Sequence, residues 1–144
     1  MPTALETLEE LQDYAYKKDI GIHTEYYQSN CEGCYTIQNG EGMITINRRF
    51  INTSDDYCRI LAEEIGHAET NTVLPYSDYI DPEFKRWLKR KNEILASRWA
   101  IERILPPSRI QEALDDGYRC ICAIAEYCGV TEELLEEALI YYGW

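Results

Sequence analysis

The sequence has few basic residues and no long apolar run. It carries 14 lysines and arginines against 26 aspartates and glutamates, which gives a net charge of −12. Affinity for a phosphate backbone comes from clustered Lys and Arg, so we expect no direct nucleic-acid ligand. Nowhere do about 18 apolar residues follow one another, and the first residues lack the basic and apolar regions of a signal peptide. We therefore expect no membrane segment and a cytoplasmic location.

A disulfide framework is not expected, although the chain contains six cysteines. The sequence shows no secretory signal, and it is long enough to bury about two-thirds of its unfolded surface, so it does not need disulfides for stability. We therefore expect the cysteines to be reduced thiols. Cys31 and Cys34 form a C-x-x-C pair. A structural zinc would need two further ligands, and the pair lies between expected strands rather than at the strand-to-helix junction typical of redox sites. Its role stays open.

The first third of the chain predicts one helix and a small sheet. Apolar residues recur at helical spacing from Thr3 to Lys17. Three segments then alternate apolar and polar residues as strands do: Ile22 to Tyr26, Tyr35 to Ile37, and Met43 to Asn47. The turn sequence from Asn39 to Gly42 separates the last two, so we expect a hairpin and a meander.

From Ser54 onward the pattern is helical. The expected helices run from Ser54 to Thr70, Pro82 to Leu105, Ser108 to Asp116, Tyr118 to Cys128 and Glu132 to Tyr142. The fold class is therefore α+β, mostly helical, with a small three-stranded antiparallel or mixed sheet and a C-terminal helical bundle. We expect a single domain over 1–144. It comprises 1–53 with the first helix and the sheet, 54–105 with two central helices, and 106–144 as a helical subdomain.

Residues 63–67, Glu-Glu-Ile-Gly-His, resemble the H-E-x-x-H motif of zinc proteases with Glu63 at the first histidine. In that motif two histidines four apart on a helix hold Zn²⁺, and the intervening glutamate activates water. At 100° per residue, Glu64 and His67 lie within the apolar face of the expected helix. Glu63 lies at its edge, one turn before His67, so its carboxylate and the imidazole can converge on one point.

An ionisable pair on a core-facing stripe is costly unless it is paired or bound to metal, which favours a site. The alternative is a chance match in an acidic helix, with His67 as a hydrogen-bonded core residue. Glu93 is the candidate third ligand. It begins a stripe with Ala96 and Ala100, whose small side chains permit the close approach of another helix. The alternative for Glu93 is a solvent-facing position on a charged helix.

Four segments in order resemble the ImmA/IrrE family of metallopeptidases, which are zincin-like proteins common in phages and mobile elements. Ile60 to Ala68 resembles the family's H-E-[LI]-G-H-A segment, and Ile44 to Asn47 resembles the strand before it. Glu93 to Pro107 resembles E-x-x-A-x-x-[FW]-A-x-x-L-[ML]-P, and Ile124 to Glu133 resembles the family's usual ending. The resemblance implies a zincin-like fold for most of the chain.

The resemblance implies a role for each motif residue. Glu64 would be the general base and acid, and His67 and Glu93 would be zinc ligands, with Glu63 in the place of the family's usual first histidine. Two carboxylates and one imidazole suit Zn²⁺ or Mn²⁺. The extra negative charge makes the metal a weaker Lewis acid, so we expect peptidase activity to be slowed or lost. Tyr76 and Tyr79, between the two central helices, are candidate oxyanion donors.

The family resemblance also implies a protein substrate, a helix-turn-helix repressor encoded beside the peptidase. The alternative is a catalytically impaired or metal-free pseudoprotease that acts as an antirepressor by binding its partner. A third possibility comes from Ala125 to Thr131, which has the outline of a DNA-binding helix-turn-helix. The four glutamates of the following helix argue against it, because they would repel phosphates.

Overall fold

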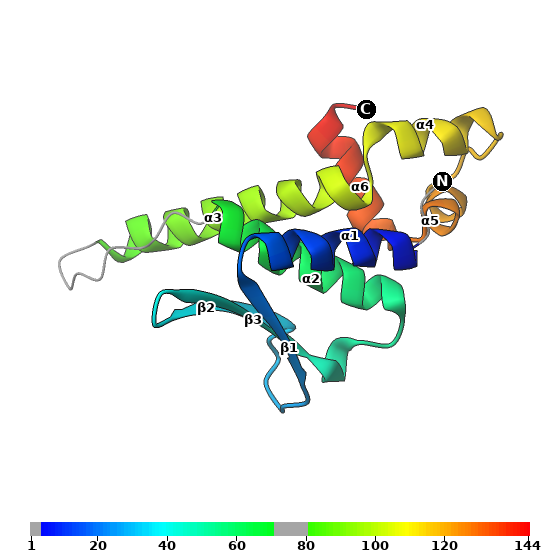
Figure 1. Cartoon of the computed structure of the whole chain (residues 1–144). Coiled ribbons are helices and arrows are strands. Elements are labelled where there is room, and N and C mark those ends of the chain that lie inside the picture. Colours follow the sequence, from blue (N-terminus) through cyan, green and yellow to red (C-terminus); the bar gives the residue numbers. More distant parts are fainter. Residues whose placement is uncertain (1–3, 71–80) are drawn as a thin grey trace.

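The computed structural model describes residues 4–70 and 81–144 (Figure 1). Its elements are α1 (Ala4–Lys17), β1 (Ile20–Glu25), β2 (Gly33–Gln38), β3 (Glu41–Asn47), the 3-10 helix η1 (Arg48–Phe50), α2 (Ser54–Thr70), α3 (Pro82–Ile104), α4 (Pro107–Asp115), α5 (Ile121–Cys128) and α6 (Glu132–Tyr142). The described part is mostly helical with one small mixed sheet, so the α+β prediction is confirmed.

The sheet is built around β3, in the order β1-β3-β2. β2 pairs with β3 antiparallel through a two-residue turn at Asn39 and Gly40, whose φ angles of 53° and 81° suit a type I′ turn. The predicted hairpin is therefore confirmed. The predicted meander is wrong, because β1 lies parallel to β3 instead of beside β2. Ile44 and Ile46 of β3 are fully buried, which explains why this strand takes the central position.

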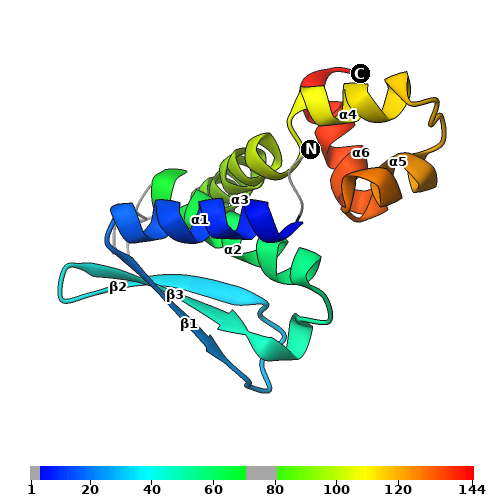
Figure 2. The same ribbon diagram turned by 45° about the vertical axis from the view of Figure 1, so that its right-hand side comes forward.

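α1 and α2 cover one face of the sheet, and α3 lies beyond α2 (Figures 1 and 2). α2 packs against β2 and β3, α1 packs against α2 and β1, and α3 packs against α2. The short helices α4, α5 and α6 gather near the C-terminal end of α3 (Figure 2). One cluster of buried apolar residues runs from Leu11 in α1 to Ala138 in α6. No helix among the described residues has both the length and the apolar character needed to cross a bilayer.

The helix ends follow local capping chemistry. Asp81 accepts a hydrogen bond from the backbone N–H of Glu83, as its position before Pro82 predicts. Gly129 ends α5 in the left-handed region at φ 70°, and the Thr131 side chain caps α6. The start of α5 differs from the prediction. The helix begins at Ile121 instead of Tyr118, with Cys120 as its N-cap residue.

α3 has two unlike halves. Its second half contributes Trp99, Ile101 and Ile104 to the core. Its first half extends past α1 (Figure 1) and is exposed at most positions, with Leu88 and Asn92 as the buried exceptions. This exposed half carries five of the chain's 14 basic residues: Lys85, Arg86, Lys89, Arg90 and Lys91.

α2 and α3 approach each other closely at Gly66. A Cβ atom at this position would lie 2.5 Å from the carbonyl oxygen of Ala96 and 3.0 Å from its Cα. Ala96 and Ala100 are each 1% exposed, in agreement with the expectation that small side chains permit close approach. The two helices therefore meet backbone to backbone, and a side chain at position 66 would force them apart.

Gly66→Ala is expected to lower the free energy of unfolding by about 1–3 kcal/mol, because the methyl group overpacks the contact with Ala96. In an exposed helix the same change would raise it by about 1 kcal/mol. Urea denaturation of the two proteins measures the difference. Adding Ala96→Gly should not restore stability, because the clash involves the backbone of residue 96. A more stable Gly66→Ala protein would contradict the close approach.

Candidate functional site

α2 places Glu64 against an edge strand of the sheet. The residue is only 8% exposed, as its position in the apolar face of the helix predicts. Its side chain lies beside the start of β2: a Cβ atom on Gly33 would be 3.1 Å from Cγ of Glu64. The buried carboxyl group thus lies between the motif helix and the outer strand of the β2–β3 hairpin.

His67 meets Glu93 across the α2–α3 interface. The imidazole Nε2 lies 3.4 Å from Oε2 of Glu93. The side chain of His67 is 16% exposed and that of Glu93 is 60% exposed, so the imidazole is largely buried and the carboxylate faces solvent. His67 directly follows Gly66 and Glu93 precedes Ala96 by nearly one turn, so the close helix contact brings them within reach.

Glu63 interacts with an arginine. Its Oε1 lies 3.5 Å from Nη1 of Arg59, one helical turn earlier, and the same Nη1 donates to Oε2 of Glu32 at 2.9 Å. Burial raises the pKa of Glu63, and the Arg59 guanidinium opposes that rise. Arg59 therefore provides positive charge to the very carboxylate that stands in place of the motif's first histidine. The sequence motifs gave no sign of this arginine.

Glu63, His67 and Glu93 line one cleft of about 550 Å³. α6 completes its wall with Glu137, Ile140 and Tyr141. Glu137 accepts a hydrogen bond of 3.1 Å from the hydroxyl of Ser97, which links α6 to α3. The sequence did not predict these α6 residues as part of the site, because the only pattern in this helix is its run of glutamates.

The donor types in this cleft suit a divalent cation, because imidazole nitrogen and carboxylate oxygen both bind Zn²⁺ and Mn²⁺. Within residues 4–70 and 81–144, no three His, Cys, Asp or Glu side chains are grouped closely enough to hold a metal. Of the predicted ligands, His67 and Glu93 are brought together, whereas Glu63 interacts with Arg59. The donor atoms of Glu63, His67 and Glu93 are of the right kind for a metal ion. Glu63 would have to break its ion pair with Arg59 to become a ligand. The candidate oxyanion donors Tyr76 and Tyr79 lie outside the described residues.

The environment of Glu64 suits proton transfer near neutral pH. The pKa of this carboxyl group is raised to about 7. Burial is the main cause, His67 opposes it, and the neighbouring carboxylates of Glu63 and Glu93 add to it. A carboxyl group with such a pKa can both accept and release a proton under ordinary conditions.

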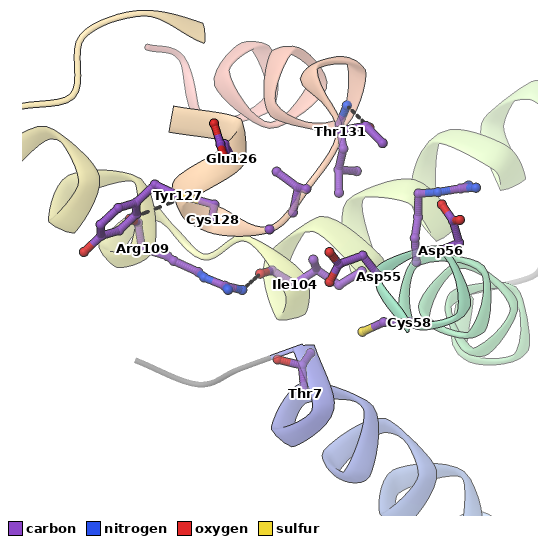
Figure 3. A pocket seen from close by; sticks show the side chains of 14 residues that line it. Thr7, Asp55, Asp56, Cys58, Ile104, Arg109, Glu126, Tyr127, Cys128 and Thr131 are labelled. Carbon is purple, nitrogen blue, oxygen red and sulfur yellow. Dashed lines mark hydrogen bonds between the residues drawn. The ribbon is translucent and has the colours of Figure 1, made fainter. Parts of the chain in front are cut away.

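A second cavity, of about 370 Å³, lies between the start of α2 and the turn that joins α5 to α6 (Figure 3). Burial raises the pKa of Asp55 in this cavity, and nearby Arg109 opposes that rise. Burial also raises the pKa of Cys58 to about 11 and that of Cys128 above its usual value, so both thiols are protonated at neutral pH. Glu64, His67 and Glu93 are not part of its lining, so we do not assign the site here.

Comparison with known protein families identifies a match over most of the chain. The model of the Peptidase_M78 family, described as the IrrE N-terminal-like domain, matches residues 12–139. This span includes the sheet, both helices that carry the candidate site residues, and most of α6. No curated protein and no solved structure matches the chain significantly.

Glu64→Gln is expected to stabilise the metal-free protein above about pH 8 and to have little effect on charge-dependent stability below about pH 4. The folded-state pKa is raised from 4.5 to about 7. Between these values the folded protein holds a proton that the unfolded chain releases, so the stability of the unsubstituted protein falls as pH rises. The expected gain at high pH is on the order of 3 kcal/mol, from a shift of about 2.5 pH units at about 1.4 kcal/mol each.

Urea denaturation over a pH series, with a chelator present, measures this difference. Glu133→Gln is the matched control at an exposed glutamate. A stability difference between Glu64→Gln and the unsubstituted protein that does not change with pH would contradict the expectation.

Proposed function

This chain belongs to the IrrE N-terminal-like (ImmA/IrrE) family of metallopeptidases, and from that premise we propose that it is a metal-dependent endopeptidase acting at the cleft beside α2. One observation carries the proposal. His67 and Glu93 lie 3.4 Å apart on adjacent helices, next to a buried glutamate one position after Glu63. This is the juxtaposition of imidazole, carboxylate and general base that metal-assisted hydrolysis requires.

The proposed site has three ligands that line the cleft and a proton carrier, Glu64, on the side of α2 that faces β2. His67 and Glu93 would hold the metal, with Glu63 as the third ligand after release from Arg59. A bound Zn²⁺ or Mn²⁺ would supply a Lewis acid for the peptide carbonyl. Glu64 would take the proton of the attacking water on its carboxylate and deliver it to the leaving amine. Its near-neutral pKa suits both steps.

The substrate side of the proposal rests on β2 and on charge. β2 is an edge strand beside Glu64, so an extended peptide could add to it as a further strand and pass the general base. Glu63, Glu93 and Glu137 make the cleft wall acidic, although Arg98 also lines it. Acidic walls favour a basic partner, which supports a helix-turn-helix repressor as the substrate.

A second candidate function is a pseudoprotease that binds the repressor without cutting it. The ion pair between Arg59 and Glu63 favours it, because an arginine already provides positive charge to the carboxylate that would otherwise face a metal. In this case the cleft would act as an antirepressor surface by occupancy alone.

Elemental analysis of the purified protein is expected to find one equivalent of Zn²⁺ or Mn²⁺, lost in both His67→Ala and Glu93→Ala. These substitutions remove two of the three proposed ligands. Glu133→Ala controls for the loss of a surface carboxylate, and a Cys31→Ser, Cys34→Ser double variant controls for metal bound by thiols. Metal that is absent, or retained in both ligand variants, would favour the pseudoprotease.

Glu64→Gln is expected to keep the metal and to slow repressor cleavage by about 10²–10⁴-fold, the usual contribution of a general base. Electrophoresis of the repressor after incubation with each protein measures cleavage, and a reporter gene measures derepression. Under the pseudoprotease alternative, derepression would survive the Glu64→Gln change undiminished.

A further inference from the structure

Two exposed cysteines are in contact at the start of α5. Cys120 is the N-cap residue of the helix and Cys122 follows two positions later. Their sulfur atoms lie 3.3 Å apart, and both side chains are exposed. The pair lies outside the cleft that contains His67 and Glu93.

This geometry allows the two thiols to join. A disulfide requires a sulfur separation of about 2.05 Å, and rotation about the side-chain torsions can close the remaining gap. Cys120 has extended backbone angles, φ −110° and ψ 152°, because it precedes the first helical residue. Its side chain can therefore face that of Cys122. Two cysteines at i and i+2 inside a helix would not face each other.

The helix start also makes the two thiols unequal. The backbone N–H of Ala123 donates to both sulfurs and lowers both pKa values, whereas the contact between the two thiols lowers the pKa of Cys120 only. The same contact raises the pKa of Cys122. Nearby Glu132 opposes ionisation of both. Cys120 is thus the better nucleophile, whereas the buried thiols Cys58 and Cys128 are held in the protonated form.

We propose that Cys120 and Cys122 form a thiol–disulfide exchange site for low-molecular-weight disulfides such as oxidised glutathione. The Cys120 thiolate attacks one sulfur of the small disulfide, forms a mixed disulfide and releases one glutathione thiolate. Cys122 then attacks the Cys120 sulfur, which forms the Cys120–Cys122 disulfide and releases the second glutathione. The protein loses two electrons and two protons, and the small disulfide becomes two thiols. An exposed disulfide of this kind is easily reduced again, so the site can cycle.

The test is mass spectrometry of the full-length protein after incubation with oxidised glutathione and acid quenching. Proteolysis after Arg119 and after Glu126 releases peptide 120–126, which contains Cys120 and Cys122 but not Cys128. In the unsubstituted protein, peptide 120–126 is expected to lose the mass of two hydrogen atoms. Cys122→Ser should retain one glutathione on Cys120, and Cys120→Ser should react at least about tenfold more slowly. The Cys31→Ser, Cys34→Ser double variant is the matched control and should still lose two hydrogens from this peptide.

Three results would overturn the proposal. A glutathione adduct that persists on peptide 120–126 of the unsubstituted protein would show that Cys122 does not resolve it. A peptide that stays unmodified would show that the thiols do not exchange. Equal rates for Cys120→Ser and Cys122→Ser would remove Cys120 as the attacking thiol. Circular dichroism of each variant confirms that the serine substitutions leave the fold intact.

Discussion

The backbone contact between Gly66 and Ala96 sets the geometry of the cleft. α2 and α3 can touch there only because one residue has no side chain and the other has a methyl group. His67 follows the contact on one helix and Glu93 precedes it on the other, so the distance between the two backbones determines the 3.4 Å between imidazole and carboxylate. The opposite side of α2 meets β2, which places Glu64 within the same structural unit. A widening at Gly66 would therefore disturb every part of the site.

Charge balance is the second constraint on this region. Glu32, Glu63, Glu64 and Glu93 all act on the same stretch of α2, and their mutual repulsion contributes to the raised pKa of Glu64. Arg59 offsets part of this charge by binding both Glu32 and Glu63. A histidine at position 63, as in the H-E-x-x-H motif, would add no negative charge and would need no such partner. The glutamate variant of the motif and Arg59 thus form one electrostatic arrangement.

Much of this arrangement could be predicted from the sequence, because periodicity and capping are local signals. These signals predicted the helices, the hairpin, the burial of Glu64 and the close helix approach at Ala96. The parallel placement of β1 could not be predicted, since alternation shows which residues share a face but not which strand is the neighbour. Arg59 and the α6 wall of the cleft also had no local pattern. The Cys120–Cys122 contact could not be predicted, because it depends on where α5 begins. In a helix that began at Tyr118, the two thiols would point in different directions.

The two unlike halves of α3 have a consequence for the whole molecule in solution. Five of the protein's 14 basic residues lie on the exposed first half of α3, while the rest of the chain is strongly acidic. The net charge of −12 therefore conceals a large separation of positive and negative charge, and such a molecule has a substantial electric dipole moment. An approaching charged partner experiences a torque as well as a net force. The first half of α3 thus influences which side of the protein a partner meets first, without contacting the cleft itself.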